Sequence, residues 1–142
     1  MPFEIRVVYE MPLEAEMDLD VAVKKFLRQI GYLAQDREET IGFRIFREFF
    51  LERPERVWSA DEIAVSLGTS KPTVYRYIRK LRNMELIEDG EREDESGKKR
   101  GYRMKYGDFI RAWSMVEANV KVAMENYKRS VEHIARLAKE RA

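Results

Sequence analysis

Two clusters of cations are the residues in this sequence with the clearest chemical potential. Residues 69–82 hold Lys and Arg side chains without a single acid, and residues 98–106 do the same. Between them lies an acidic block at residues 85–95. The formal net charge of the chain is only +1, so it is the distribution of charge that is informative. Separate basic clusters in a balanced chain are typical of phosphate binding.

The first cluster lies on a segment that the spacing of residues predicts to be a helix. Val74, Ile78 and Leu81 recur at i, i+4 and i+7 and form an apolar face, and Arg76 and Arg79 lie opposite them. Guanidinium groups on such a face can donate hydrogen bonds to guanine edges or phosphates. Hydroxyls at a helix N-terminus, together with the backbone N–H groups there, favour phosphate binding. The residues expected to contact DNA here are Ser70, Lys71, Thr73, Tyr75, Arg76, Arg79 and Lys80. The alternative is a solvated face with surface salt bridges, which the lack of an acid within the helix disfavours.

The elements around this helix follow from turn and cap signals. A helix is expected from about Glu38 to Glu52, and a short strand at residues 57–58. The next helix begins at a capping box, Ser59 to Glu62, and ends at Gly68. After the basic helix, residues 86–88 and 102–106 are predicted strands of a hairpin with a long tip, because glycines occupy the stretch between them.

This order of elements, and the residues in it, resemble a known fold. VWSADEIA (residues 57–64) resembles the positioning helix of winged helix-turn-helix domains, LGTSKPTVYRYIRKL (67–81) their turn and recognition helix, and MELIE (84–88) the entry to their wing. The resemblance covers residues 38–106 and is to prokaryotic, especially archaeal, regulators of the broad ArsR, MarR and TrmB-like group. It implies a transcription regulator that binds double-stranded DNA.

The predicted wing has two arms of opposite charge. The returning arm carries Lys98, Lys99 and Arg100, which we expect to contact the DNA backbone. The outgoing arm carries acids at residues 91–95, which departs from that expectation. Either the acidic arm faces away from DNA, or the two arms neutralise each other across the hairpin.

The C-terminal segment carries a long apolar stripe. Its residues are spaced alternately by four and three, which is the 3.5-residue repeat of a coiled coil. A helix of this length, roughly 40 Å, cannot bury its whole stripe on a small domain, so we expect a homodimer. The alternative is packing against the helix of residues 21–34, and both can occur together. The predicted dimerisation residues are Phe109, Trp113, Val116, Val120, Ala123, Tyr127, Ile134 and Leu137.

The N-terminal segment predicts one strand and one helix. Apolar residues alternate with more polar ones from Phe3 to Tyr9, which fits a half-buried strand. Asp18 or Asp20 can then cap a helix whose apolar face holds Val23 and Leu27.

Several function classes have no supporting residues. The chain has no cysteine, and it lacks a glycine-rich phosphate loop, a metal-binding HExxH and a nucleophile elbow, so we expect no enzyme, no metal and no cofactor. No signal peptide or apolar membrane span is apparent, so a soluble, cytoplasmic protein is expected. The 37% of charged residues and the scarcity of Asn and Gln resemble thermophile proteins. Aromatic residues Trp58, Tyr102, Phe109 and Trp113 could line an effector pocket, although plain core packing is the commoner role.

The sequence therefore predicts a mainly α fold with a small β-hairpin wing, a winged helix-turn-helix followed by a coiled-coil dimerisation helix. The expected divisions are an ancillary strand and helix at 1–36, the DNA-binding domain at 37–106 and the dimerisation helix at 107–142. The expected function is sequence-specific transcription regulation as a homodimer. The alternative is a winged helix that docks on a general transcription factor, motivated by the acidic N-terminal stretch and wing arm.

Overall fold

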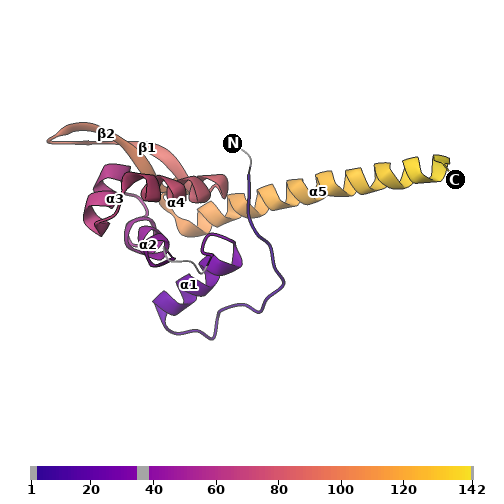
Figure 1. Cartoon of the computed structure of the whole chain (residues 1–142), viewed down its shortest axis with the longest axis horizontal. Helices are drawn as coiled ribbons and strands as arrows, with labels where there is room; N and C mark the ends of the chain where they lie inside the picture. The colour runs from indigo at the N-terminus through magenta and orange to yellow at the C-terminus, as the bar shows by residue number, and fades with distance from the viewer. Residues whose placement is uncertain (1–2, 35–38, 142) are drawn as a thin grey trace.

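A small helical body sits at one end of a long projecting helix in the computed structural model, which describes residues 3–34 and 39–141 (Figure 1). The fold is mainly α with a two-stranded antiparallel hairpin, as predicted. The predicted helix start at Glu38 and the boundary between residues 36 and 37 lie outside the described residues. The elements are α1 (Leu19–Gln29), α2 (Glu39–Arg44), the π-helical segment η1 (Ile45–Leu51), α3 (Ala60–Leu67), α4 (Lys71–Asn83), β1 (Ile87–Asp94), β2 (Gly97–Met104), the 3-10 turn η2 (Lys105–Gly107) and α5 (Phe109–Arg141).

The helix boundaries lie where the sequence places its caps. The Ser59 hydroxyl accepts the backbone N–H of Glu62 at 3.1 Å, and the Glu62 carboxylate accepts that of Ser59 at 3.0 Å, which completes the capping box. Gly68 ends α3 with a φ of 63°, a left-handed conformation that favours glycine. Asp18 and Ser70 cap α1 and α4 through their side-chain oxygens. These four ends are confirmed.

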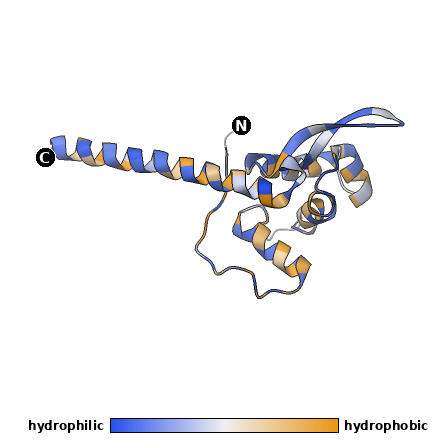
Figure 2. Ribbon diagram, turned by 180° about the vertical axis from the view of Figure 1, so that it is seen from behind, coloured by the Kyte–Doolittle hydropathy of each residue, from blue (hydrophilic) through white to orange (hydrophobic). Residues whose placement is uncertain are grey.

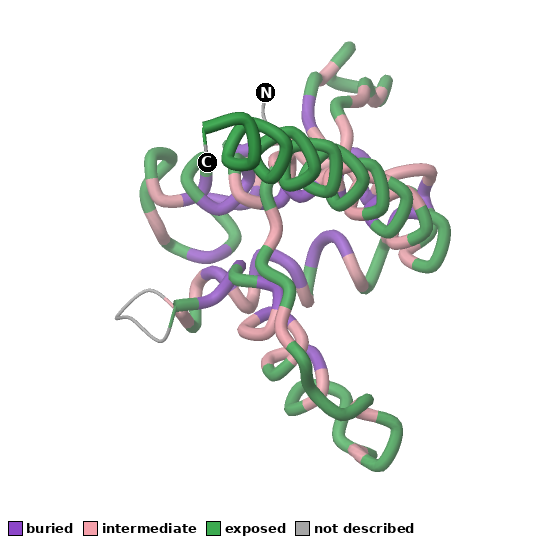
Figure 3. The backbone as a smooth tube through the Cα atoms, turned by 90° about the vertical axis from the view of Figure 1, so that its right-hand side faces the viewer, coloured by how far each residue is buried: buried purple, intermediate pink, exposed green. Residues whose placement is uncertain are grey.

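One hydrophobic cluster joins the helices of the body. It extends from Val23 and Leu27 on α1, through the phenylalanines of η1, to Ile78 on α4 and Val116 on α5. In Figure 3 the buried segments gather where these elements meet, whereas the far half of α5 is exposed. The N-terminal helix is thus part of the same core as the helices that follow it.

Gly42 on α2 lies in close contact with two tyrosines, Tyr77 on α4 and Tyr32 after α1. Tyr77 on α4 is only 1% exposed, and a Cβ added to Gly42 on α2 would lie 2.4 Å from its ring. The Tyr32 hydroxyl donates to the Gly42 carbonyl at 2.7 Å. Burial raises the pKa of Tyr32 well above its ordinary value of 10.0, with a further contribution from Tyr77, so the phenol stays protonated and remains a donor. Glycine at this position lets the two helices approach.

The predicted N-terminal strand is wrong. Residues 3–12 form no strand, although the N–H groups of Glu4 and Arg6 donate to the carbonyls of Asn83 and Ile30 at 2.8 and 3.0 Å. Alternating apolar residues fit a strand only when a neighbouring strand pairs with it, and none lies here among the described residues.

The predicted long tip of the hairpin is also wrong. β1 and β2 pair along their full length from Ile87 opposite Met104 to Asp94 opposite Gly97, so only Glu95 and Ser96 connect them. The predicted strand at residues 57–58 is a single bridge, in which Trp58 exchanges two backbone hydrogen bonds of 2.8 Å with Tyr102.

Helix α5 changes character along its length. In its first turns Val116 is fully buried, and the rings of Phe109 and Trp113 pack edge-on against Phe26 of α1 at centroid distances of 5.9 and 5.4 Å. These three predicted dimer contacts therefore pack within their own chain, since α1 covers this part of the stripe. Beyond Val120 the helix projects away from the body (Figure 1). No helix within residues 3–34 and 39–141 is both long and apolar enough to cross a membrane.

Candidate nucleic-acid interface

The N-terminus of α4 presents polar groups at the surface of the body. The Ser70 hydroxyl accepts the backbone N–H of Thr73 at 3.3 Å and lies 3.0 Å from its hydroxyl. Lys71 reaches back to Asp61 on α3, with 2.9 Å between the ammonium nitrogen and the carboxylate. This contact raises the pKa of Lys71 through a hydrogen bond and the charge of Asp61. The predicted phosphate site at this helix end thus has one cation and a competing carboxylate.

The outer face of α4 is cationic and exposed. Arg76 and Arg79 lie exposed on the side opposite the buried Val74, Ile78 and Leu81. The guanidinium of Arg76 lies over the Tyr77 ring, 5.0 Å from its centroid, and donates to the Tyr77 hydroxyl at 3.3 Å. Such stacking fixes the orientation of a guanidinium.

Lys80 does not join this face. Its ammonium group donates to the backbone carbonyl of Tyr32 at 3.2 Å and lies 5.2 Å from the Tyr77 ring centroid. The side chain is therefore engaged with the segment that follows α1. Arg82 is also engaged, since it pairs with Asp89 of β1 at 3.3 Å.

The two arms of the wing carry opposite charges that face each other. The strand register places Glu91 opposite Arg100 and Glu93 opposite Lys98. The Arg100 guanidinium lies 3.7 Å from the Glu91 carboxylate, yet its side chain remains 92% exposed. Of the two arrangements that the sequence allows for the wing, the register therefore matches mutual neutralisation across the hairpin. Lys99 lies opposite Arg92, so the residue directly across the hairpin from Lys99 is a cation and not an acid.

Arg92 attaches the wing to the body. Its guanidinium donates to the Val57 carbonyl at 2.6 Å and to the Glu62 carboxylate at 2.8 Å, and it lies 3.3 Å from Asp94. Burial disfavours the charge on Glu62, but hydrogen bonds from Arg92 and Ser59 outweigh it and lower the pKa of this carboxyl. The acid that completes the α3 capping box thus also holds β1, so the wing has a defined orientation relative to α3.

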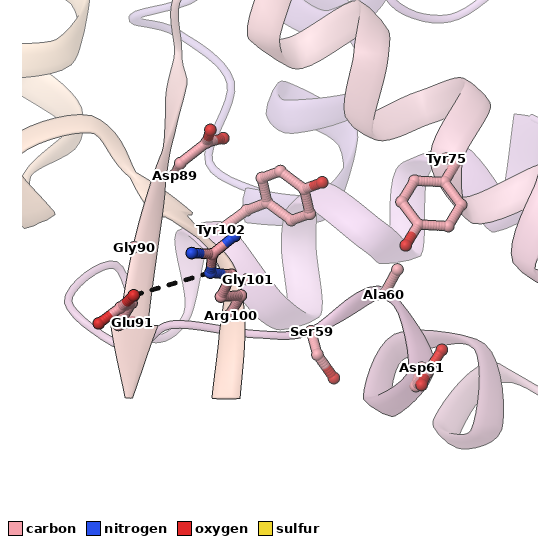
Figure 4. Close-up of a pocket in the computed structure, with 10 residues that line it drawn as sticks. All are labelled: Ser59, Ala60, Asp61, Tyr75, Asp89, Gly90, Glu91, Arg100, Gly101 and Tyr102. Atoms are coloured by element: carbon pink, nitrogen blue, oxygen red, sulfur yellow. Dashed lines mark ion pairs between the residues drawn. The ribbon is translucent and has the colours of Figure 1, made fainter. Parts of the chain in front are cut away.

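A cleft of about 570 Å³ separates α4 from the wing (Figure 4). Tyr75 of α4 and Tyr102 of β2 stand on opposite sides of it, and Asp61 and Asp89 lie at its edges. Burial raises the pKa of Tyr102, so its hydroxyl is a donor at neutral pH. Within residues 3–34 and 39–141, only Arg100 contributes a cation to the cleft lining.

The four aromatic residues considered for one effector pocket lie at different sites. Trp58 packs edge-on against Phe49 at 4.9 Å, and its indole N–H donates to the Phe49 carbonyl at 3.1 Å. Tyr102 lines the cleft beside the wing, whereas Phe109 and Trp113 line a separate groove against α1.

Comparison with known proteins matches the centre of the chain. Residues 40–90 match the family model of the IclR helix-turn-helix domain. This stretch is a helix-turn-helix domain. It extends from α2 through α3 and α4 into β1, and the β1–β2 hairpin that continues from it is the wing. The resemblance to prokaryotic winged helix-turn-helix regulators is thereby confirmed, and α3 and α4 are the two helices of the motif.

Solved structures with some similarity to this helix-turn-helix chain include regulators. A possible transcriptional regulator from Methanosarcina mazei Go1 is 17% identical, over 65% of this chain and 75% of that one, with a TM-score of 0.44. Staphylococcus aureus MepR in its DNA complex is 18% identical, over 84% and 76% of the two chains, with a TM-score of 0.37. MepR bound to ethidium bromide is 15% identical, over 84% of each chain, with a TM-score of 0.31. No protein of curated function matches the sequence.

The predicted contact residues lie at several places around the helix-turn-helix domain. Ser70, Lys71 and Thr73 lie at the N-terminus of α4, and Arg76 and Arg79 are exposed on its outer face. Tyr75 lines the cleft together with Arg100, and Lys98 and Lys99 lie farther along β2, next to the turn of the hairpin. Arg92 was missed, because the sequence shows it only as a lone cation within an acidic run. Two sequence features could have identified Arg92: it is the single cation within the acidic run, and the capping-box acid Glu62 needs a cationic partner.

Proposed function

We propose that the chain is a sequence-specific transcription regulator that binds double-stranded DNA as a homodimer. The observation that carries this proposal is the exposed pair Arg76 and Arg79 on α4, opposite the face that packs into the core. An α-helix fits the major groove of DNA, where arginine forks pair with the O6 and N7 atoms of guanine. Such a regulator acts in the cytoplasm of a prokaryotic cell and needs no catalytic group.

The remaining predicted residues hold the domain in register on the backbone. Ser70, Lys71 and Thr73 lie at the N-terminus of α4, where the helix dipole favours phosphate. Lys71 must leave Asp61 to do so, a small cost because both side chains are more than half exposed. Lys98, Lys99 and Arg100 on the wing contact flanking phosphates, and Tyr75 faces the cleft between the two elements.

Each of the three segments of the chain has a separate role in this proposal. Residues 37–106 bind DNA, residues 107–142 pair two copies, and residues 1–36 support both. The distal stripe of α5, which includes Tyr127, Ile134 and Leu137, is exposed in the single chain and offers the surface for pairing. Two half-sites would provide the specificity that one small domain lacks.

The decisive experiment is selection of bound genomic fragments, followed by titration of the selected duplex with variants. Replacing Arg76 and Arg79 together with Ala should weaken specific binding by roughly 1–3 kcal/mol per lost base contact, without loss of fold. Arg53→Ala is a matched control, because Arg53 is an exposed arginine in the turn before α3. Unchanged affinity of the folded double variant would contradict the assignment of α4.

A second candidate function is docking on a basic surface of a general transcription factor. The acidic residues around the cleft, Asp61, Asp89 and Glu91, favour it, since they would repel a phosphate placed there. The two functions differ in salt dependence. DNA affinity that falls steeply with salt supports the first, whereas weak, salt-insensitive DNA binding supports the second.

A further inference from the structure

Exposed apolar side chains are unevenly distributed in this molecule. Among the described residues, the large apolar side chains that remain exposed lie almost entirely in residues 7–21 and 110–137, with only Val65 and Tyr75 elsewhere. Tyr127, Ile134 and Leu137 on distal α5 are 66%, 63% and 45% exposed. Surfaces of this kind, when contiguous, mark an interaction site.

A groove between α1 and the first turns of α5 is the apolar cavity nearest to this surface. This α1–α5 groove has a volume of about 450 Å³ and an almost entirely apolar lining that includes Leu13, Phe26, Phe46, Ile110 and Trp113. Among the described residues, Glu117 is the only charged one that lines it. Ile110 lines this groove and is 80% exposed.

The groove and the distal stripe belong to one continuous helix surface. Phe109, Trp113 and Val116 begin the repeat and pack against α1, and Val120, Ala123 and Tyr127 continue it with increasing exposure. Figure 2 shows the projecting half of α5 as mostly hydrophilic with interspersed apolar positions, whereas the half against the body is more apolar. A partner that follows the stripe toward the body meets α1 and is directed into the groove beside it.

The charges of the two regions are opposite. Residues 121–141 of α5 carry six Lys or Arg and three Glu, a net charge of +3. Residues 3–20, which lead into α1 and contribute Leu13 to the groove, carry six acids and one Arg, a net charge of −5. The partner that suits the groove is therefore a basic helix with an apolar stripe, which describes the distal α5 itself.

We propose that the α1–α5 groove receives the distal α5 of a second copy of this chain, so that the two long helices pair in antiparallel orientation. The inference rests on the proposed homodimer and specifies its geometry. The symmetry of such a pair places Leu137 near Ile110 of the other copy and Ile134 near its Trp113, with the twofold axis near residues 123 and 124. Residues 110 and 137 of one copy are about 40 Å apart, so contact between them must come from two chains.

Parallel pairing is disfavoured by the same features. It would place two distal segments of net charge +3 side by side, and α1 already occupies the stripe near the body, so only the distal half could pair. Antiparallel pairing instead brings the basic distal segment of each copy to the α1–α5 groove of the other, next to the acidic residues 3–20.

Disulfide mapping tests this geometry directly, since the chain has no cysteine of its own. Ile110→Cys and Leu137→Cys chains are mixed, allowed to exchange subunits and oxidised. We expect the 110–137 disulfide between chains as the main product, and neither variant cross-linked to itself. Ala118→Cys mixed with Leu137→Cys is the control, because Ala118 is exposed on a different face of α5. Self-cross-linking of Leu137→Cys would overturn the antiparallel pairing and leave the homodimer intact.

A charge variant tests the groove without disturbing the protomer. Ile110→Glu should raise the dimer dissociation constant at least tenfold in sedimentation, because Ile110 is exposed in the single chain and covered only by the partner. Val65→Glu, at an equally exposed site on α3, should leave it unchanged. An unchanged dissociation constant for Ile110→Glu would overturn the inference. A second result would also overturn the inference: the wild-type dimer binds Nile red stoichiometrically, and Ile110→Glu abolishes this binding. The groove would then be a small-molecule site. If the wild-type chain stays monomeric yet binds DNA with specificity, the homodimer in the proposed function is contradicted as well.

Discussion

The attachment of the wing to α3 allows a quantitative prediction. Arg92→Met removes the guanidinium and keeps most of the apolar stem. The change eliminates a 2.6 Å hydrogen bond to the Val57 carbonyl and the 2.8 Å pair with Glu62, at side chains that are only 17% and 22% exposed. Hydrogen bonds to charged groups contribute about 1.5–3 kcal/mol each, and partial exposure reduces this, so we expect a loss of about 2 kcal/mol in the free energy of unfolding.

Thermal and denaturant unfolding measure this loss. For a chain of this length the melting temperature should fall by roughly 6–8 °C, with an unchanged denaturant slope. Arg100→Ala is the matched control on the same hairpin, because Arg100 is 92% exposed and lies 3.7 Å from its partner Glu91. Surface pairs of this kind contribute about 0–1 kcal/mol, so its stability should stay near that of the wild type.

The dependence on pH identifies the partner of Arg92. The pKa of Glu62 is lowered in the folded chain, so the stabilisation is fully present above its ordinary value of 4.5 and is lost as the pH falls through the lower folded value. The stability difference between wild type and Arg92→Met should therefore narrow below pH 4.5. In a Glu62→Gln background, which retains a capping residue, Arg92→Met should lower the free energy of unfolding by less than it does in the wild type. Equal losses for Arg92→Met and Arg100→Ala, or a difference independent of pH, would refute the attachment.

Three further outcomes are expected. Lys98→Ala should weaken DNA binding equally on all sequences and reduce the slope of log affinity against log salt by about 0.9, whereas a loss on one sequence alone would make the wing a base reader. Val120→Glu should dissociate the homodimer in light scattering while the helix-turn-helix domain stays folded, since a buried unpaired charge costs several kcal/mol. Gly42→Ala should destabilise the chain by about 1–3 kcal/mol in thermal unfolding, because its Cβ would lie 2.4 Å from the Tyr77 ring. An unaltered melting temperature for Gly42→Ala would mean that α2 and α4 can move apart freely.

Local signals predicted the helix-turn-helix domain well. Its boundaries depend on Ser59, Glu62, Gly68 and Ser70, whose backbone preferences act within a few residues of the chain. The amphipathic pattern of α4 assigned the exposed and buried faces for the same reason. The pattern did not assign Tyr77, because an aromatic residue at the border of the apolar stripe is buried or exposed according to what packs there, here Gly42. It also placed Lys80 on the DNA-contacting face, whereas Lys80 donates to the distant Tyr32 carbonyl.

The failures involve partners that are distant in sequence. The alternation at residues 3–9 predicted a strand, but the described part of the chain holds no neighbouring strand that pairs with it. The glycines at residues 90, 97 and 101 predicted a long tip, but Gly101 allows the close approach of the Trp58 carbonyl, 2.2 Å from where a Cβ would lie. The regular repeat of α5 indicated one interface, whereas its first turns pack on α1. A seven-residue repeat predicts that an apolar stripe packs against another helix, but it does not identify whether that helix belongs to the same chain or to a second one.

The Lys80 contact with the Tyr32 carbonyl affects which helices can unfold locally on their own. Tyr32 also donates to Gly42, so α1, α2 and α4 are linked through one residue that is fully buried. Amide hydrogens of α1 should then exchange with solvent only when α4 also unfolds, and the three helices should show the same protection. The N-terminal helix would belong to the cooperative folding unit that presents Arg76 and Arg79, and a fragment starting at residue 37 would lose the protection of α4 itself.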